Sequence, residues 1–291
     1  MFAEERQQQI AELVVGNGRV SVTLLAERFS ITTETVRRDL AALESAGTLR
    51  RVHGGAVPAD RASTTEASVT ERAIQHPDQK IRIAEAALAM VPTHWDGSVL
   101  IDGGTTTEVL ADLLAHRAAV TNATAAHAAV ERQGTEAAAQ AETADTSAAQ
   151  APRELVVITH AVPIAGKLST VPGIALQVLG GRVRGLTQVA VGHATADAAV
   201  RLRPDIAFLG TNGISASFGL STPDPEEAAV KAAFVRSARR IVVLADSSKL
   251  DTETLVQFAS LKDLDTLITD SEPGPELAAA LEEAGVDVVI A

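Results

Sequence analysis

Residues Thr32 to Gly55 read TTETVRRDLAALESAGTLRRVHGG, and this stretch decides how the amino-terminal part of the chain folds. If Val36 is buried, Leu40 and Leu43 follow on the same face of a helix, because residues four and seven positions apart share a face. The opposite face carries Glu34, Arg37, Arg38 and Ala41. The pattern predicts a helix that buries one side and offers the other side to a groove.

A short hairpin follows this helix. Gly47 is expected to end the helix, Leu49 and Val52 suit a strand, and Gly54-Gly55 permit a tight reversal. Arginine suits DNA because its flat guanidinium forms paired hydrogen bonds with phosphate oxygens and with the O6/N7 edge of guanine. The residues that we expect to contact DNA are Thr33, Glu34, Arg37, Arg38, Arg50, Arg51 and His53.

Asp39 lies beside the two helix arginines, but phosphate repels a carboxylate. We therefore expect Asp39 to hold a neighbouring arginine or a helix end instead of DNA. For Arg37 and Arg38 the alternative to DNA contact is a plain solvated helix face, which the arginines of the hairpin make less attractive.

Two helices are expected upstream. The first is an amphipathic helix marked by Arg6, Ile10, Leu13 and Val14, which the turn at residues 16–18 ends. Ser21 is a suitable residue to open the second helix. Its inward residues are expected to be Leu24, Leu25 and Phe29. Three helices followed by a hairpin form a winged helix-turn-helix domain.

This domain resembles the amino-terminal domain of the DeoR family of bacterial repressors. The positions that match the signature of the family are Arg6, Ile10, Val14, Thr32, Thr35, Val36, Arg37, Arg38, Asp39 and Leu40. The resemblance implies that residues 1–57 form an α+β winged helix-turn-helix domain that binds double-stranded operator DNA.

The charges of the chain are unevenly distributed. The 291 residues include 37 acidic and 25 basic ones, which gives a formal net charge of −12. Residues 1–57 contain seven Lys/Arg and seven Asp/Glu, so the remainder carries all of the excess. Because an acidic second domain repels DNA, one copy should bind DNA weakly. We therefore expect a homo-oligomer, either a dimer or a tetramer.

The chain has no cysteine, which excludes disulfides and thiolate metal sites, and we expect neither a metal nor a cofactor. No apolar run reaches the ~18 residues that a membrane span needs. The chain starts with a charged amphipathic helix and not with a signal peptide. We therefore expect a cytoplasmic protein that has no membrane partner.

The length suggests two folding units. Residues 58–78 are rich in Ala, Ser and Thr and are interpreted as a linker with at most one short ordered stretch. Residues 79–291 contain continuous apolar runs rich in Val and Ile, which are typical of strands buried on both faces, and helical patterns such as 226–239 lie between several of them. The runs are 99–101, 155–158, 174–179, 206–209, 241–244 and 267–268. They predict an α/β domain with a largely parallel sheet.

One segment breaks this pattern. Residues 118–152 have a near-repetitive Ala, Thr, Gln and Glu composition without a sustained apolar stripe from Gly134 on. We interpret them as a mostly disordered insertion without a function, in which residues 124–132 form at most a marginal helix.

Small polar clusters follow several of the predicted strands. The sequence DGGTTT at 102–107 offers glycines, a helix start and three hydroxyls, which suit a phosphate, although a glycine turn with a threonine cap would look similar. In an open α/β sheet such strand ends converge on one crevice. Arg182 and Lys249 could balance the charge of a phosphate, and Asp102, Asp246 and Asn212 could bind sugar hydroxyls. Lys231 belongs to this set or pairs with Glu227.

These clusters resemble the carboxy-terminal sensor domain of the DeoR family, which is similar in fold to ribose-5-phosphate isomerase and the acetyl-CoA transferases. The matching residues are 102–107, 180–181, 210–213, 219–222, Lys231 and 246–249. The chain departs from the family at His160-Ala161, where Asn-Ser is usual. The resemblance implies a sugar-phosphate effector. From the matching residues and the other strand-end clusters together, we expect it to be bound by Asp102, Gly103, Gly104, Thr105, Thr106, Thr107, His160, Gly181, Arg182, Gly210, Thr211, Asn212, Gly213, Lys231, Asp246 and Lys249.

Three functions compete. The favoured one is a repressor of a sugar uptake or catabolism operon, which a phosphorylated sugar releases from DNA. The second is a sugar-phosphate isomerase or transferase, with Asp102, Asp246 or Glu227 as the base. No catalytic carboxylate pair surrounds the phosphate loop, and a metabolic enzyme has no use for a DNA-reading domain, so we expect no enzyme. The third is a DNA-binding regulator or architectural protein without a ligand, which leaves the polar clusters unexplained.

The sugar itself is harder to name, because ring form and stereochemistry depend on geometry. The stretch 220–250 resembles regulators of fructose uptake, which makes fructose 1-phosphate the first candidate.

Overall fold

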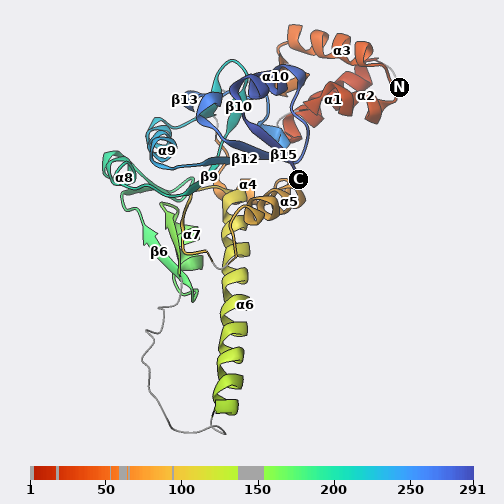
Figure 1. The fold of residues 1–291 in the computed structure, drawn as a ribbon. Coiled ribbons are helices and arrows are strands. Elements are labelled where there is room, and N and C mark those ends of the chain that lie inside the picture. Colours follow the sequence, from red (N-terminus) through yellow and green to blue (C-terminus); the bar gives the residue numbers. More distant parts are fainter. Residues whose placement is uncertain are drawn as a thin grey trace.

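The computed structural model describes residues 3–17, 20–52, 54–58, 64, 66–93, 95–136 and 154–291, with the backbone alone at 16–17, 52 and 123–136. The chain folds into an amino-terminal domain of helices with a small sheet and a larger carboxy-terminal α/β domain (Figure 1). Within these described ranges, no helix is both long enough and apolar enough to span a membrane.

The amino-terminal domain has the predicted winged helix-turn-helix fold. Its elements are α1 (Ala3–Asn17), β1 (Val20–Ser21), α2 (Val22–Phe29), α3 (Thr33–Ser45), β2 (Leu49–Val52) and β3 (Gly55–Pro58). The strands form an antiparallel sheet in the order β1-β3-β2. Helices α1, α2 and α3 pack around a common core that includes Ile10, Leu25, Val36 and Leu40.

The ends of α3 form as the sequence indicates. The hydroxyl of Thr32 accepts a hydrogen bond from the backbone N–H of Thr35 at 3.2 Å and so caps the start of the helix. The helix ends at Ser45, and Gly47 follows with φ of 71°, a conformation that favours glycine. Val36, Leu40 and Leu43 are buried, which confirms the inward face predicted for this helix.

The prediction for α2 was wrong at one position. Leu24 is 49% exposed, and Val22 is buried in its place beside Leu25. The helix begins at Val22 after the Ser21 cap, so its buried positions are 22 and 25, and Phe29 is partly buried against the core. Three apolar residues within four positions leave the inward face of a short helix ambiguous.

The prediction for Asp39 is confirmed. Asp39 is buried, and its Oδ2 accepts a hydrogen bond from Nε of Arg6 at 2.6 Å. Its Oδ1 accepts bonds from Nη2 of Arg6 at 3.2 Å and from Nε2 of Gln7 at 2.9 Å. The carboxylate therefore ties α3 to α1 on the inner side of the domain.

The carboxy-terminal domain is built on a seven-stranded sheet in the order β15-β14-β12-β9-β4-β5-β6, and every neighbouring pair is parallel. All six predicted apolar runs are strands of this sheet: β4 (Ser98–Ile101), β5 (Leu155–Thr159), β6 (Ile174–Val178), β9 (Ile206–Gly210), β12 (Ile241–Leu244) and β14 (Thr266–Thr269). The edge strand β15 (Asp287–Ile290), whose side chains are mostly exposed, was not predicted.

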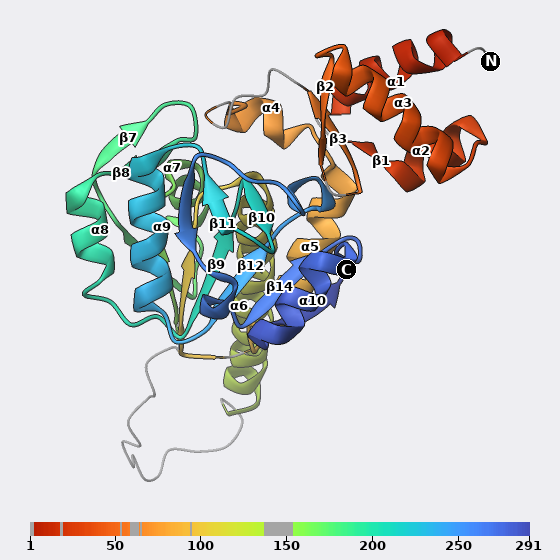
Figure 2. The same cartoon turned by 90° about the horizontal axis from the view of Figure 1, so that it is seen from above.

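Helices cover both faces of this sheet, as Figure 2 shows. Alternate residues of β4 point to opposite faces: Val99 and Ile101 belong to one buried cluster and Leu100 to another. The first cluster includes residues of α5 (Pro77–Ala89), α6 (Thr105–Glu136) and α7 (Val162–Leu168). The second includes residues of α8 (His193–Ala199), α9 (Pro225–Ser237) and α10 (Pro275–Ala284).

Smaller elements that the sequence did not indicate flank the sheet. One antiparallel sheet contains β10 (Gly213–Ser215), β11 (Gly219–Thr222) and β13 (Val256–Ala259), and a hairpin contains β7 (Arg182–Arg184) and β8 (Val189–Val191). Two short 3₁₀ helices are η1 (Ser247–Lys249) and η2 (Leu261–Asp263).

Part of the predicted linker is ordered on the carboxy-terminal domain. Helix α4 (Val69–Ala73) begins with a capping box between Ser68 and Glu71. The backbone N–H of Val69 donates to the carbonyl of Leu186 at 2.9 Å, and Glu66 forms an ion pair with Arg184. The end of the linker is therefore attached to the β7–β8 hairpin.

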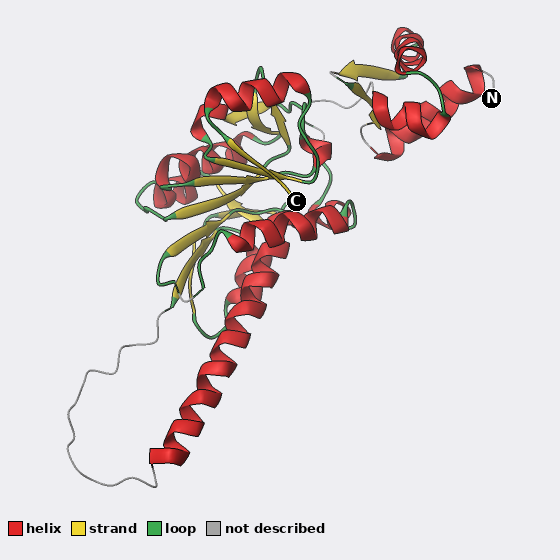
Figure 3. Ribbon diagram, turned by 45° about the vertical axis from the view of Figure 1, so that its right-hand side comes forward, coloured by secondary structure: helices red, strands yellow, loops and turns green. Residues whose placement is uncertain are grey.

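The start of the predicted insertion is helical. Helix α6 continues to Glu136, well beyond the marginal helix expected at 124–132, and extends past the rest of its domain (Figure 3). Its first part packs against α5 and the sheet, so the alanine-rich continuation lengthens an existing helix and has no nucleation cost. The rest of the insertion lies outside the described residues.

Candidate functional site

The order in which strands are added to the sheet reverses between β4 and β9, which are parallel neighbours. From β4 the sheet grows through β5 to β6, and from β9 it grows through β12 to β14 and β15. Ligands of open α/β sheets bind at such a switch point, beyond the carboxyl ends of the strands. A cavity lies there, with an empty volume of about 610 Å³ that includes its open mouth.

Most of the predicted effector-binding residues meet at this cavity. The turn after β4 forms one wall, and the ends of β9 and β12 form another. The predicted residues that line it are Gly103, Gly104, Thr105, Thr106, Thr107, Gly210, Thr211, Asn212, Lys231, Asp246 and Lys249. Four separate segments of the predicted set thus contribute to a single cavity.

The wall after β4 suits an anion. Helix α6 starts at Thr105, and its first N–H groups have no partner within the helix. The turn before it is closely packed, since a Cβ at Gly103 would lie 2.0 Å from Cγ1 of Val189. The N–H groups at the start of α6 are the donors that this turn can offer to a phosphate.

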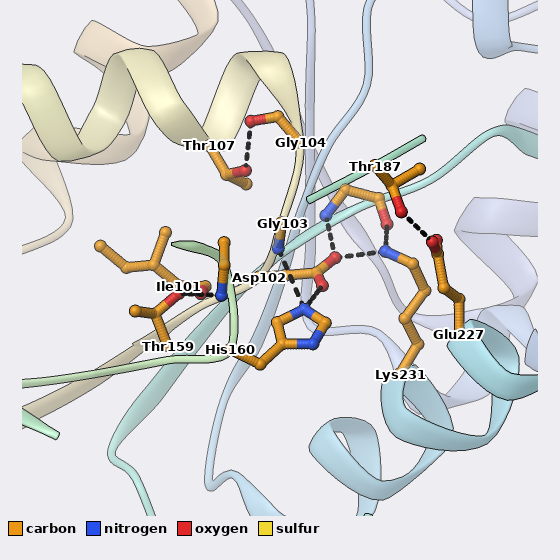
Figure 4. Close-up of polar contacts among 12 residues, drawn as sticks. Ile101, Asp102, Gly103, Gly104, Thr107, Thr159, His160, Thr187, Glu227 and Lys231 are labelled. Atoms are coloured by element: carbon orange, nitrogen blue, oxygen red, sulfur yellow. Dashed lines mark hydrogen bonds and ion pairs between the residues drawn. The ribbon is translucent and has the colours of Figure 1, made fainter. Parts of the chain in front are cut away.

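A buried polar network centred on Asp102 lies behind the wall of the cavity (Figure 4). Its Oδ2 accepts hydrogen bonds from Nζ of Lys231 and, at 3.0 Å, from the backbone N–H of Gly210. Its Oδ1 lies 3.0 Å from Nε2 of His160. The other ring nitrogen of His160 lies 2.8 Å from the carbonyl of Ala190. Asp102 and His160 therefore lie behind the cavity wall and hold Lys231 in place.

This network controls the ionisation of Asp102. Burial alone would raise the pKa of this carboxyl, but the charge of Lys231 and the hydrogen bond with His160 outweigh burial and lower the pKa to about 2. A fully buried, ionised carboxylate with both oxygens occupied is a poor general base. Asp102 therefore does not suit the role of an isomerase base.

Five predicted residues do not line the cavity, which corrects the expected set: Asp102 and His160 lie behind its wall, and Gly181, Arg182 and Gly213 lie elsewhere. The guanidinium of Arg182 pairs with Glu226 on α9, and its side chain is 62% exposed. Gly181 packs against Thr195, and Gly213 lies in β10 against the backbone of Thr252. Gly181 and Arg182 belong to the β7–β8 hairpin or the turn before it, and Gly213 belongs to β10, which pairs with β11 outside the seven-stranded sheet.

Four neighbouring polar residues of the cavity wall were not predicted from the sequence: Arg72, Gln75, His76 and Lys80. They come from α4, α5 and the corner between these helices, in or next to the segment that was interpreted as a linker. The S-x-x-E capping box at Ser68 and Pro77 in the first turn of α5 were the available signals for these helices. Glu227 and Thr187 also line the cavity and bond to each other.

The cavity carries an excess of positive charge. Among the described residues, four basic side chains line it, Arg72, Lys80, Lys231 and Lys249, against the two acidic ones Glu227 and Asp246. Asp102 balances the charge of Lys231 from behind the wall, which leaves three basic side chains against two acidic ones. Burial lowers the pKa of Lys80 to about 8, although the nearby charge of Asp246 acts in the opposite direction. In a chain with a net charge of −12, this local excess favours an anionic ligand.

The residues predicted to contact DNA are exposed on α3. Arg37 and Arg38 each lie 3.8 Å from Glu34, and the side chain of Arg38 is 81% exposed. Such exposed pairs contribute little to stability, so both arginines can turn to another partner. Thr33 and Glu34 are exposed in the first turn of the same helix.

The hairpin arginines differ from each other in their contacts. Nε of Arg51 lies 2.6 Å from Oε2 of Glu44, and this bond lowers the pKa of Glu44. Arg50 and Arg51 also line a groove that Ser215, Ser217 and Glu253 of the other domain complete. The hairpin therefore faces the carboxy-terminal domain on one side. His53 lies outside the described residues.

Comparison with protein families gives two matches. Residues 6–62 match the family described as "DeoR-like helix-turn-helix domain". Residues 133–271 match the family described as "DeoR C terminal sensor domain". The first match begins within α1 and includes the rest of the winged helix-turn-helix domain up to β3. The second match includes β5 to β14.

Curated proteins resemble the chain over almost its full length. It is 31% identical to "HTH-type transcriptional regulator GlpR" of Haloferax volcanii, over 99% of this chain and 98% of that protein. It is 29% identical to "Uncharacterized HTH-type transcriptional regulator FruR" of Bacillus subtilis, over 94% and 93%. It is 27% identical to "Glycerol-3-phosphate regulon repressor" of Escherichia coli, also over 94% and 93%.

Among solved structures, ribose 5-phosphate isomerase A from Methanocaldococcus jannaschii is similar to 60% of this chain and 55% of its own. The TM-score is 0.36 and the sequence identity 16%, a likeness too low to support a functional argument.

Proposed function

The chain belongs to the DeoR family of transcriptional regulators, and from this membership we propose that it represses an operon for sugar uptake or catabolism until a phosphorylated sugar releases it from operator DNA. Its relatives are named regulators and repressors, and the chain is a regulator rather than an enzyme. Operator binding requires access to the chromosome, so we also propose a cytoplasmic location.

One observation carries the effector proposal: a cavity with excess positive charge at the switch point of the sheet, in an otherwise acidic chain. A phosphate that reaches the turn Gly103–Thr107 would receive the first N–H groups of α6, and Lys249 and Lys231 would contribute charge. Asn212 and Asp246 line the same cavity and could bind sugar hydroxyls. A phosphorylated sugar would engage both sets of groups, whereas a free sugar would engage only the second.

The identity of the sugar belongs to the same proposal. Fructose 1-phosphate is our first candidate, on the sequence resemblance over 220–250. One relative is named for the glycerol 3-phosphate regulon, which makes that compound a useful second candidate. Both carry a phosphate monoester on a small polyol.

On the DNA side, the exposed face of α3 is proposed to enter the major groove with Arg37 and Arg38, and the hairpin to contact the backbone with Arg50 and Arg51. The net-neutral reading domain is attached to an acidic body, so two or more copies are needed for tight binding. We therefore propose a homo-oligomer that binds repeated half-sites.

Release then follows from linkage. The protein has one arrangement that binds DNA and another that does not. A ligand can remove the protein from DNA only if its affinity for the second arrangement is higher than its affinity for the first. The test is a gel-shift titration of the operator complex with fructose 1-phosphate, glycerol 3-phosphate, fructose and glycerol. We expect release by a phosphorylated compound and not by its free counterpart.

The matched variants are Lys249→Ala and Thr105→Ala, which remove one charge and one hydroxyl from the proposed phosphate site. Lys249→Ala should raise the concentration needed for release roughly tenfold, since a charge-assisted hydrogen bond contributes ~1.5–3 kcal/mol. Equal release by free and phosphorylated sugars, or unchanged release from the double variant, would contradict the phosphate assignment. Release by no compound would favour a regulator that works without a ligand.

A further inference from the structure

Helix α4 brings a cationic side chain to the cavity from the segment that joins the two domains. Arg72 lies on this helix and lines the cavity beside the turn Gly103–Thr107. Its Nε is buried and, within the part of the chain that the structure describes, has no hydrogen-bond partner. A buried guanidinium donor without a partner is costly unless a ligand or water occupies the site.

Two other cations of the cavity are already engaged. Lys231 donates to Asp102 and to the carbonyl of Gly210. Lys80 donates to the carbonyls of Arg72 and Gln75, which fixes the corner between α4 and α5. Arg72 differs from both: Lys80 holds its backbone carbonyl, Nε of its guanidinium is an unused buried donor, and the residue lines the cavity.

From this arrangement we propose that Arg72 is a direct ligand of the effector phosphate, which it binds opposite the start of α6. The proposal rests on the proposed function, since it assigns a residue to the same effector site. A guanidinium forms two parallel hydrogen bonds with phosphate oxygens, and the N–H groups of Thr105 and Thr106 can reach the remaining ones. The phosphate then bridges the interdomain segment and the sheet domain.

The same corner borders the groove that faces the winged helix-turn-helix domain. His76, which starts α5, lines both the effector cavity and this second groove. The second groove also contains Arg37 of α3 and Gly54 of the hairpin. The backbone of His76 has φ of 52°, a strained conformation for a residue other than glycine. A phosphate bound to Arg72 would therefore act four residues away from His76, whose strained backbone borders the DNA-reading domain.

Calorimetry of the full-length protein tests the assignment, with inorganic phosphate, fructose 1-phosphate and glycerol 3-phosphate as ligands. Arg72→Gln should weaken binding of the phosphorylated ligands at least tenfold. Arg82→Gln is the matched control, because Arg82 is an exposed arginine on the neighbouring helix α5 that does not line the cavity. The Arg82→Gln variant should bind these ligands as tightly as the wild-type protein does.

The two proposals fail in different ways. If the wild type binds none of the phosphorylated ligands, the proposed function is wrong. If the wild type binds one of them and Arg72→Gln binds it equally well, the assignment of Arg72 is overturned and the effector site stands.

A second measurement avoids the risk that the variant misfolds. Phenylglyoxal modifies accessible arginines of the wild-type protein, and mass spectrometry measures the modification of each one. Bound phosphate ligand should slow modification of Arg72 several-fold and leave Arg82 unaffected. Equal modification of Arg72 with and without a saturating ligand would overturn the proposal.

Discussion

Lys231 donates a hydrogen bond to Oδ2 of Asp102, a residue 129 positions earlier in the chain, and both side chains are buried. The bond joins α9, which covers one face of the sheet, to the end of β4 at its centre. The same Lys231 lies over the ring of Phe258 at 5.5 Å and donates to the carbonyl of Gly210. One ammonium group thus connects α9 to β4 and β9 directly beneath the cavity.

Lys231→Met should lower the free energy of unfolding by ~3–5 kcal/mol, because it leaves the buried carboxylate of Asp102 without its cation. Urea unfolding followed by the fluorescence of Trp95, the only tryptophan, measures this loss in the carboxy-terminal domain. The double variant Lys231→Met/Asp102→Asn should recover a large part of the stability. A loss below ~1 kcal/mol in the single variant would show that the pair is not energetically coupled.

Asp102 should make stability depend on acid pH. Its folded-state pKa of about 2 lies below its ordinary value of 3.8, so its stabilising contribution is present above about pH 4 and is lost as the pH falls through 2. Between these values the wild type should lose about 2 kcal/mol relative to Asp102→Asn, which cannot ionise. Unfolding free energies of the two proteins at pH 4 and at pH 2 give this difference. A constant difference across the window would contradict the assignment.

The strands and the cavity were predictable to different degrees. A strand such as β9 is buried on both faces and therefore appears in the sequence as a continuous apolar run. Edge strand β15 carries exposed Val288 and Ile290, and its short apolar run does not distinguish it from an ordinary terminus. The order of the strands depends on pairing between distant segments, which no local pattern encodes.

Lys80 should take up a proton when a phosphate ligand binds near pH 8.5. Its pKa in the free protein is about 8, so most Lys80 side chains are neutral there, and a nearby phosphate dianion favours the charged form. Calorimetry in two buffers of different ionisation enthalpy should show net proton uptake at pH 8.5 and almost none at pH 6.8. The uptake should disappear in Lys80→Met. Identical apparent enthalpies in the two buffers at pH 8.5 would contradict this coupling.

Arg38→Ala should cost ~1–3 kcal/mol of operator affinity if this side chain reads a guanine, and it should relax sequence preference at that position. Arg51→Ala should instead weaken binding to all sequences and reduce the slope of affinity against salt by about one phosphate contact. Gel-shift titrations at two salt concentrations separate these effects. Arg201→Ala, an exposed arginine of the other domain, is the control. Unchanged affinity in both Arg37→Ala and Arg38→Ala would exclude α3 as the recognition helix.

The full-length protein should sediment as a dimer or a larger species at micromolar concentration. Its DNA-reading domain is net neutral and its body carries the whole net charge of −12, so a single copy gains little electrostatic affinity for DNA. Analytical ultracentrifugation at two ionic strengths measures the state directly. A monomer under both conditions would remove the argument for paired half-sites.

The residues of the cavity wall that escaped prediction share a physical cause. The turn Gly103–Thr107 was recognisable because it follows a buried strand and precedes a helix. Arg72 and His76 come from short, polar helical segments whose composition is that of a linker, and only packing against the β7–β8 hairpin and α6 gives them fixed positions. The prediction that Arg182 binds the effector was wrong for a different reason. A local glycine-arginine pattern cannot show that a distant residue, Glu226, holds the arginine side chain outside the cavity.

The adjacency of β4 and β9 also fixes the order of events during synthesis. The winged helix-turn-helix is complete by Pro58, whereas Asp102 cannot meet its partner until residue 231 has left the ribosome. At a translation rate of about 5–20 residues per second, this interval lasts roughly 9–35 seconds. A nascent chain therefore holds a finished DNA-reading domain before its effector cavity exists.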